Sequence, residues 1–99
     1  MVLLNWTEQA AGDLINIRDF IAKDSPKYST IHINRIKAKA RLLKDYPKSG
    51  KIVHEIDIEN MRELIFGNYR IIYRIVNIKQ IDILTVFHSA RELNSILLL

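Results

Sequence analysis

The chain has 99 residues and a mass of 11.6 kDa, and we expect residues 1–99 to form one small domain. Its 48% hydrophobic and 26% charged residues are typical of a globular protein. The absence of cysteine excludes disulfides, thiol catalysis and cysteine-ligated metal centres. We expect a cytoplasmic protein with no membrane contact, because the sequence shows no signal peptide and no apolar stretch near the roughly 20 residues of a membrane span.

The net charge of +4 is concentrated in one segment. Residues 27–51 carry six lysines and two arginines against a single aspartate, a local charge of +7. Several of these basic residues recur at helical spacing, about 100° from the apolar stripe of the same segment. Such a flank suits an acidic protein partner or a phosphate backbone, and a solvated helix face is the simpler alternative.

The first half of the chain predicts a short strand and two helices. Residues 2–5 form an apolar run, and Thr7 is suited to cap an amphipathic helix that follows it. Ser25 and Pro26 are suited to the cap and first turn of a second helix, which we expect to run to about Tyr46. The short connection between the two predicts an antiparallel helical hairpin.

The second half changes to a period of two, which is typical of strands. The predicted strands are residues 51–56, 61–66, 69–76 and 81–87. Gly67-Asn68 suits a two-residue hairpin turn, and the tail from residue 89 to 99 is compatible with a short helix. The order β-α-α-β-β-β predicts an α+β fold, an antiparallel sheet with the helical hairpin packed on one face.

The predicted turn sets the register of the hairpin that it closes. It pairs Phe66 with Tyr69 and places alternate side chains on two faces, one under the helices and one open. On the open face we expect Glu63, Ile65, Arg70, Ile72, Arg74 and Val76. As core residues we expect Ile36, Leu43, Leu64, Ile71, Tyr73 and Leu84. A one-residue slip or a bulge would reverse parts of this assignment.

Several short segments occur in a characteristic order. They are Trp6-Thr7, Asp24-Ser25-Pro26, Tyr46-Pro47-Lys48-Ser49-Gly50, Arg62-Glu63-Leu64, Tyr69-Arg70-Ile71-Ile72-Tyr73-Arg74 and Val86-Phe87-His88-Ser89-Ala90-Arg91. Over roughly residues 5–93 the chain thereby resembles the RelE/ParE superfamily of toxins from bacterial type II toxin–antitoxin systems, nearer to ParE. The resemblance implies a toxin without cofactors or metals that is neutralised by a cognate antitoxin with an acidic C-terminal segment. It implies poisoning of DNA gyrase for a ParE-like member, ribosome-dependent mRNA cleavage for a RelE-like member, or a non-toxic binding module.

A metal-free nuclease needs a general base, a cation that stabilises the phosphate and a general acid. The candidates are Glu55 or Glu63 as the base, Arg70 as the cation and His88 as the acid. Arg70 and His88 match catalytic positions of the YoeB branch of the superfamily. In that branch a tyrosine follows the histidine, whereas here Ser89 follows His88. The predicted register places Arg70 and His88 on opposite faces of the sheet. We therefore expect the gyrase-directed activity and keep the nuclease as the alternative.

The other basic side chains are candidates for partner binding. We expect Lys37, Arg41 and Lys44 to meet acidic residues of the antitoxin. Further partner-binding candidates are Arg62, Arg74 and Arg91. His32 and His54 have no neighbour at metal-ligand spacing, and we interpret both as surface residues.

Overall fold

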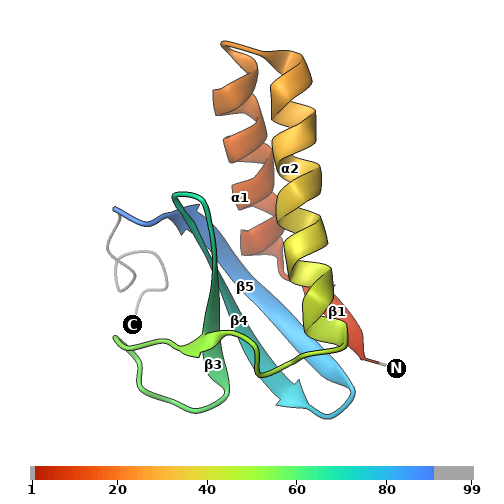
Figure 1. The fold of residues 1–99 in the computed structure, drawn as a ribbon, viewed down its shortest axis with the longest axis vertical. Helices are drawn as coiled ribbons and strands as arrows, with labels where there is room; N and C mark the ends of the chain where they lie inside the picture. Colours follow the sequence, from red (N-terminus) through yellow and green to blue (C-terminus); the bar gives the residue numbers. More distant parts are fainter. Residues whose placement is uncertain (1, 91–99) are drawn as a thin grey trace.

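The computed structural model describes residues 2–90, in which two helices and five strands follow one another (Figure 1). The elements are β1 (Leu3–Trp6), α1 (Glu8–Ala22), α2 (Pro26–Arg41), a 3₁₀ turn η1 (Leu42–Lys44), β2 (Lys51–Ile52), β3 (Met61–Phe66), β4 (Tyr69–Asn77) and β5 (Gln80–His88). The predicted α+β fold is confirmed. Of the tail from residue 89 to 99, for which we considered a short helix, Ser89 and Ala90 form a turn and the rest lies outside the described residues.

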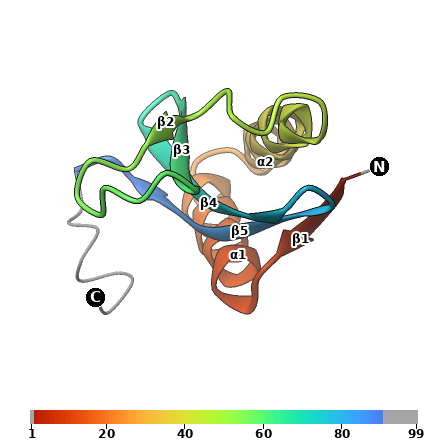
Figure 2. The same ribbon diagram turned by 90° about the horizontal axis from the view of Figure 1, so that it is seen from below.

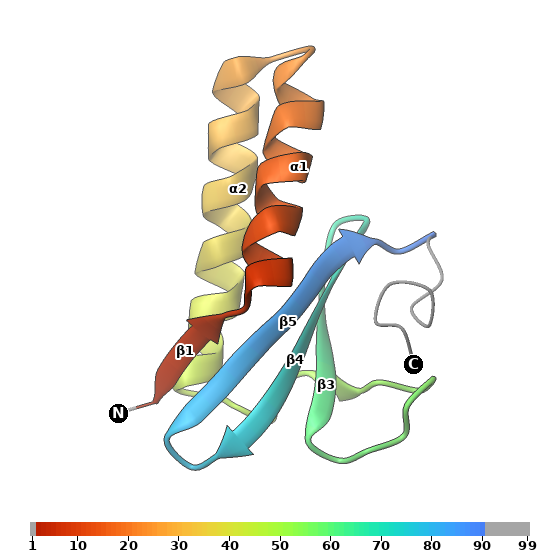
Figure 3. The same ribbon diagram turned by 180° about the vertical axis from the view of Figure 1, so that it is seen from behind.

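Local capping signals determine where the helices begin. The Thr7 hydroxyl accepts a hydrogen bond from the amide three residues later, and the Ser25 hydroxyl does the same for α2, which starts at Pro26. The buried Ser29 hydroxyl donates to the carbonyl of Arg18 at 2.6 Å and so fixes α2 against α1. The paired helices extend beyond the end of the sheet (Figures 1 and 3). In the described part of the chain, no helix has the length and apolar character to cross a membrane.

The strands form one sheet in the order β1-β5-β4-β3-β2. The pairs of β2 with β3, β3 with β4, and β4 with β5 are antiparallel, whereas β1 runs parallel to β5 at the edge of the sheet (Figure 3). The sheet is therefore mixed, and our expectation of a wholly antiparallel sheet was wrong on this point. The alternation of residues along a strand predicts its buried face, but it does not predict the strand that will pair with it.

The register of the β3–β4 hairpin is as predicted. Phe66 pairs with Tyr69, and Gly67 adopts the positive φ of 57° that the tight turn requires. The main core lies between the sheet and the helices, and α2 covers one face of the sheet when the molecule is viewed along the helices (Figure 2). The structure confirms five of the predicted core residues: Ile36, Leu43, Leu64, Ile71 and Tyr73.

Leu84 is the exception among the predicted core residues. Ile72 pairs with Thr85 and Tyr73 pairs with Ile83, so Leu84 is the extra residue of a β-bulge in β5. The bulge turns Leu84 to the opposite side of the sheet, where it packs half-buried against a second, smaller apolar cluster.

This second cluster covers part of the face that we expected to be open. Its buried members are Val53, Ile72 and Phe87. We predicted a strand over residues 51–56, but only its first two residues pair with β3. The amide of Asp57 donates to the Val53 carbonyl at 2.7 Å, and Asp57 has a φ of 56°. The chain therefore turns at Val53, and residues 53–60 fold back over the sheet as a loop, the 53–60 loop.

Tyr73 ties the turn after η1 to the centre of the sheet. Its buried hydroxyl donates to the Pro47 carbonyl at 2.7 Å and accepts from the Gly50 amide at 3.0 Å. A Cβ on Gly50 would lie 2.5 Å from the carbonyl oxygen of Glu63 and 2.6 Å from the Tyr73 hydroxyl. Only glycine fits at position 50. Close packing against β3 and Tyr73 therefore explains the glycine that ends the segment Tyr46-Pro47-Lys48-Ser49-Gly50.

Candidate functional site

Arg70 lies on β4, on the face of the sheet that the 53–60 loop covers. Its Nη1 and Nη2 atoms donate to the two carboxylate oxygens of Glu55 at 2.8 and 3.0 Å, and its Nε donates to Glu63 Oε2 at 2.9 Å. Nη2 also contacts the Glu63 carboxylate, and the Phe87 ring centroid lies 5.4 Å from the guanidinium carbon. The Arg70 side chain is only 12% exposed. Two carboxylates and an aromatic ring therefore surround the predicted phosphate-binding cation.

The ion pairs of this cluster make Glu55 unsuited to the role of general base that we considered for it. The hydrogen bonds from Arg70 lower the pKa of Glu55 from 4.5 to about 2, and the two carboxylates raise the pKa of Arg70 further. Glu55 is therefore ionised and hydrogen-bonded at neutral pH, and it is a weak base. Within residues 2–90, no three histidine, aspartate or glutamate side chains group into an arrangement that could hold a metal ion.

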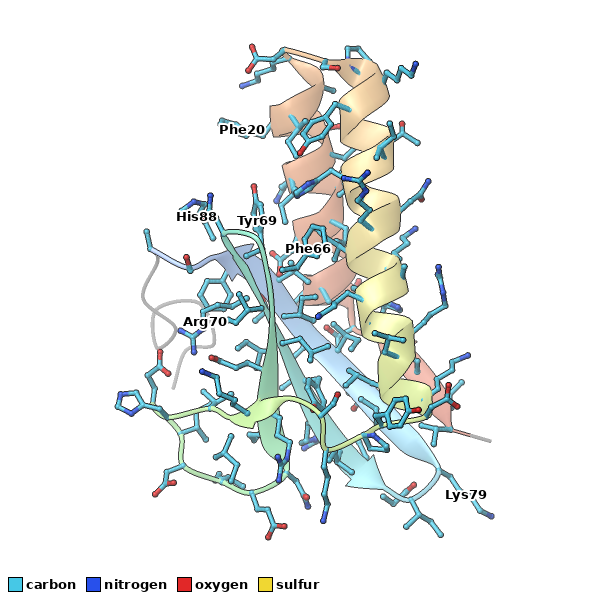
Figure 4. All side chains as sticks on the ribbon, viewed as in Figure 1. Phe20, Phe66, Tyr69, Arg70, Lys79 and His88 are labelled. Atoms are coloured by element: carbon cyan, nitrogen blue, oxygen red, sulfur yellow. The ribbon has the colours of Figure 1, made fainter. Side chains whose placement is uncertain are left out.

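His88 lies on the opposite face of the sheet, as predicted. In the β4–β5 pairing it stands beside Tyr69, whereas Arg70 stands beside Phe87. The His88 and Tyr69 rings meet edge to face at 5.7 Å, and Figure 4 shows the two together at the end of the hairpin, apart from Arg70. The structure thus brings Arg70 and Glu55 together but leaves His88 away from them.

His32 is a member of a ring cluster that our sequence analysis missed. Its ring centroid lies 5.8 Å from that of Tyr28, 5.5 Å from Phe66 and 5.4 Å from Tyr69. Burial, and secondarily the nearby Arg35, lowers the pKa of His32. His32 is therefore not a surface residue as we had interpreted it, whereas the exposure of His54 is confirmed. The available signal was the spacing of Tyr28 and His32, which places both on one face of α2.

The predicted basic flank is exposed. Lys37 and Arg41 on α2 and Lys44 on η1 form no ion pair with any described residue. Lys37 also lines a groove of about 430 Å³ between α1 and α2. The groove is lined by Trp6, Ala11, Leu14, Ile15, Arg18, Ile33 and Lys37. An apolar floor flanked by cations suits an amphipathic segment with acidic residues.

The remaining basic candidates differ in their surroundings. Arg62 is held by main-chain carbonyls of the loop that follows β2 and of Gly50, with donor–acceptor distances of 3.0 and 2.9 Å. Arg74 is half-exposed and lies 3.5 Å from Asp82. Arg91 lies outside the described residues. Partner binding by these three stays a prediction, and the contacts of Arg62 hold the loop in place.

Comparison with known proteins places this fold and these segments in a family. A family model described as "ParE toxin of type II toxin-antitoxin system, parDE" matches residues 4–93. The chain belongs to the ParE toxin family. The predicted resemblance is thereby confirmed, including the ParE branch of the superfamily.

Two relatives of this ParE-family chain match over most of their length. "Putative toxin Y4kP" of Sinorhizobium fredii (strain NBRC 101917 / NGR234) is 33% identical over 91 residues, which cover 90% of each chain. "Toxin RelE2" of Caulobacter vibrioides (strain ATCC 19089 / CIP 103742 / CB 15) is 31% identical over 91 residues, which cover 92% of this chain and 99% of the relative.

A similar fold occurs in a solved structure of a toxin–antitoxin system, "Chromosomal ParDE TA system from P. aeruginosa". The matching chain has a TM-score of 0.72 with this chain at 24% sequence identity, over 89% of this chain and 96% of that one. The two chains therefore share the arrangement of helices and sheet described above.

Proposed function

We propose that this ParE-family chain is a toxin that inhibits growth by binding and poisoning DNA gyrase in the cytoplasm. The observation that carries the proposal is the state of the nuclease candidates. Arg70 is already bound by Glu55 and Glu63, and His88 lies on the other face of the sheet. A metal-free nuclease needs these groups around one phosphate. A toxin that acts through a binding surface needs no such arrangement.

We further propose that a cognate antitoxin with an acidic C-terminal segment neutralises this toxin. The groove between α1 and α2 offers apolar contacts, and Lys37 in its lining supplies positive charge. β1 is an edge strand of the sheet, and its last residue, Trp6, lines the groove. One chain can therefore add a strand to β1 and continue as a helix in the groove.

The test measures gyrase and ribosome activity with the same purified toxin. We expect inhibition of gyrase on supercoiled plasmid and no codon-specific cleavage of mRNA on programmed ribosomes. His88→Ala and Glu55→Ala should keep growth inhibition, provided that thermal denaturation shows both variants folded, because neither removes a chemical step. Arg70→Ala should abolish mRNA cleavage only if the toxin is a nuclease. Cleavage of mRNA without any effect on gyrase would refute the proposal, and a wild type that does not slow growth would indicate a non-toxic binding module.

A further inference from the structure

The turn between β4 and β5 carries an apolar side chain that the fold does not require. Ile78 is 90% exposed, at the first position of the two-residue turn Ile78-Lys79. Asn77 Oδ1 accepts a hydrogen bond from the Lys79 amide at 2.8 Å and so fixes the conformation of the turn. Turn positions of this kind favour glycine, proline, asparagine, aspartate or serine. Isoleucine here contributes neither to the turn nor to the core.

A hollow of about 780 Å³ lies directly beside Ile78. Its walls come from the end of the β4–β5 hairpin, the turn after η1, Asn60 and Val2. Its apolar lining consists of Val2, Tyr46, Pro47, Ile75, Val76, Ile78 and Ile81. Its charged lining residue is Lys48, 3.6 Å from Glu59, and Lys79 follows Ile78 in the turn. Figure 4 shows Lys79 at the end of the sheet remote from Tyr69 and His88.

We propose that Ile78 and this hollow form the surface through which the toxin engages a folded protein target. The inference rests on the proposed function, in which the toxin acts by binding a protein. A projecting side chain on a fixed turn needs a preformed pocket in its partner, and a folded protein provides one whereas an unfolded segment does not. The target surface should be an apolar pocket with acidic charge beside it that complements Lys79, because Lys48 is already paired with Glu59. Self-association of two copies through this surface is the alternative outcome of the test.

The test compares two substitutions of the same kind. Ile78→Asp places a charge on the proposed anchor, and Ile58→Asp places one on the 53–60 loop, where Ile58 is 55% exposed and outside the hollow. We expect Ile78→Asp to weaken gyrase binding at least about 30-fold, as for an anchor residue, and to abolish growth arrest. Ile58→Asp should behave as wild type. Both variants should keep the wild-type melting temperature, and Tyr46→Ala on the facing wall of the hollow should weaken binding in the same direction.

Each outcome decides the inference. It is overturned if Ile78→Asp arrests growth like the wild type, or if it loses antitoxin binding alone and still inhibits its target. It is also overturned if sedimentation shows that the wild type self-associates and Ile78→Asp does not. Failure of the wild type to affect gyrase would refute the proposed function only. Loss of growth arrest in Ile78→Asp, with the Ile58→Asp control intact, would then still support the surface, because growth arrest does not depend on which protein is the target.

Discussion

Removal of the Tyr73 hydroxyl should destabilise the domain without changing the shape of its core. Tyr73→Phe deletes the hydrogen bonds to the Pro47 carbonyl and from the Gly50 amide. The Gly50 amide is left buried without a partner, which costs about 1–3 kcal/mol, and loss of the second hydrogen bond adds about 1 kcal/mol. We therefore expect a loss of about 2–4 kcal/mol. In a domain of this size each kcal/mol lowers the melting temperature by about 4–8 °C.

Urea denaturation measures this loss, and an unchanged dependence on urea concentration would show that the same surface still unfolds. Tyr69→Phe is the matched control, because Tyr69 is half-buried and its hydroxyl has no hydrogen bond with any described residue. Gly50→Ala should disrupt the same contact between the turn and the sheet, because its Cβ would overlap the Glu63 carbonyl. If Tyr73→Phe were as stable as Tyr69→Phe, the hydroxyl would not hold the turn. The turn also forms a wall of the hollow beside Ile78, so Tyr73→Phe should weaken target binding as well.

Three further changes test other parts of the structure. Reversing the charges of Lys37, Arg41 and Lys44 should slow association with the antitoxin and reduce its salt dependence, and unchanged kinetics at low salt would exclude their electrostatic role. Leu43→Ala should cost about 2–5 kcal/mol in urea denaturation because Leu43 is fully buried, and an unmoved midpoint would contradict the packing of η1. Glu55 is held at a pKa of about 2, so its stabilising contribution is complete above pH 4.5 and is lost as the pH falls toward 2. The stability difference between wild type and Glu55→Gln should therefore shrink with acidification, and a constant difference between pH 7 and pH 3 would refute the charged contact.

Local chemistry made much of the fold predictable. Thr7 and Ser25 mark helix starts because their hydroxyls satisfy the first amides of each helix. Gly67 identifies the hairpin turn, and the period of two then places Leu64 and Ile71 on the buried face. In each case the residues that determine the structure are neighbours in the sequence.

The features that were not predicted depend on residues far apart in the sequence. The β-bulge at Leu84 is held by Asp13 of α1, whose Oδ2 accepts from the Val86 amide at 3.0 Å and from the Thr85 hydroxyl. Nothing local to β5 predicts that contact. The 53–60 loop likewise folds back because Val53 packs against side chains of β4 and β5, which a local pattern does not reveal.

Arg70 and Glu55 could be selected as candidates from the sequence, but their contacts could not be predicted. The sequence identified Arg70 and Glu55, yet as partners in catalysis rather than as partners of each other. Their pairing requires the loop to cross the sheet, so it could be seen only in the structure. The hollow beside Ile78 was missed for the same reason, because its walls come from four separate parts of the chain.

The contacts of Arg70 explain how a residue of catalytic type can stabilise this scaffold. Its guanidinium joins the 53–60 loop, through Glu55, to β3, through Glu63, above the ring of Phe87. A phosphate could reach this cation only by displacing two carboxylates, and repulsion between three anions would oppose its approach. The same ion pairs close the loop over the second apolar cluster, so they exclude phosphate and hold the fold together at once. Substitutions in the groove between α1 and α2 or at the Ile78 turn should therefore leave the contacts of Arg70 intact.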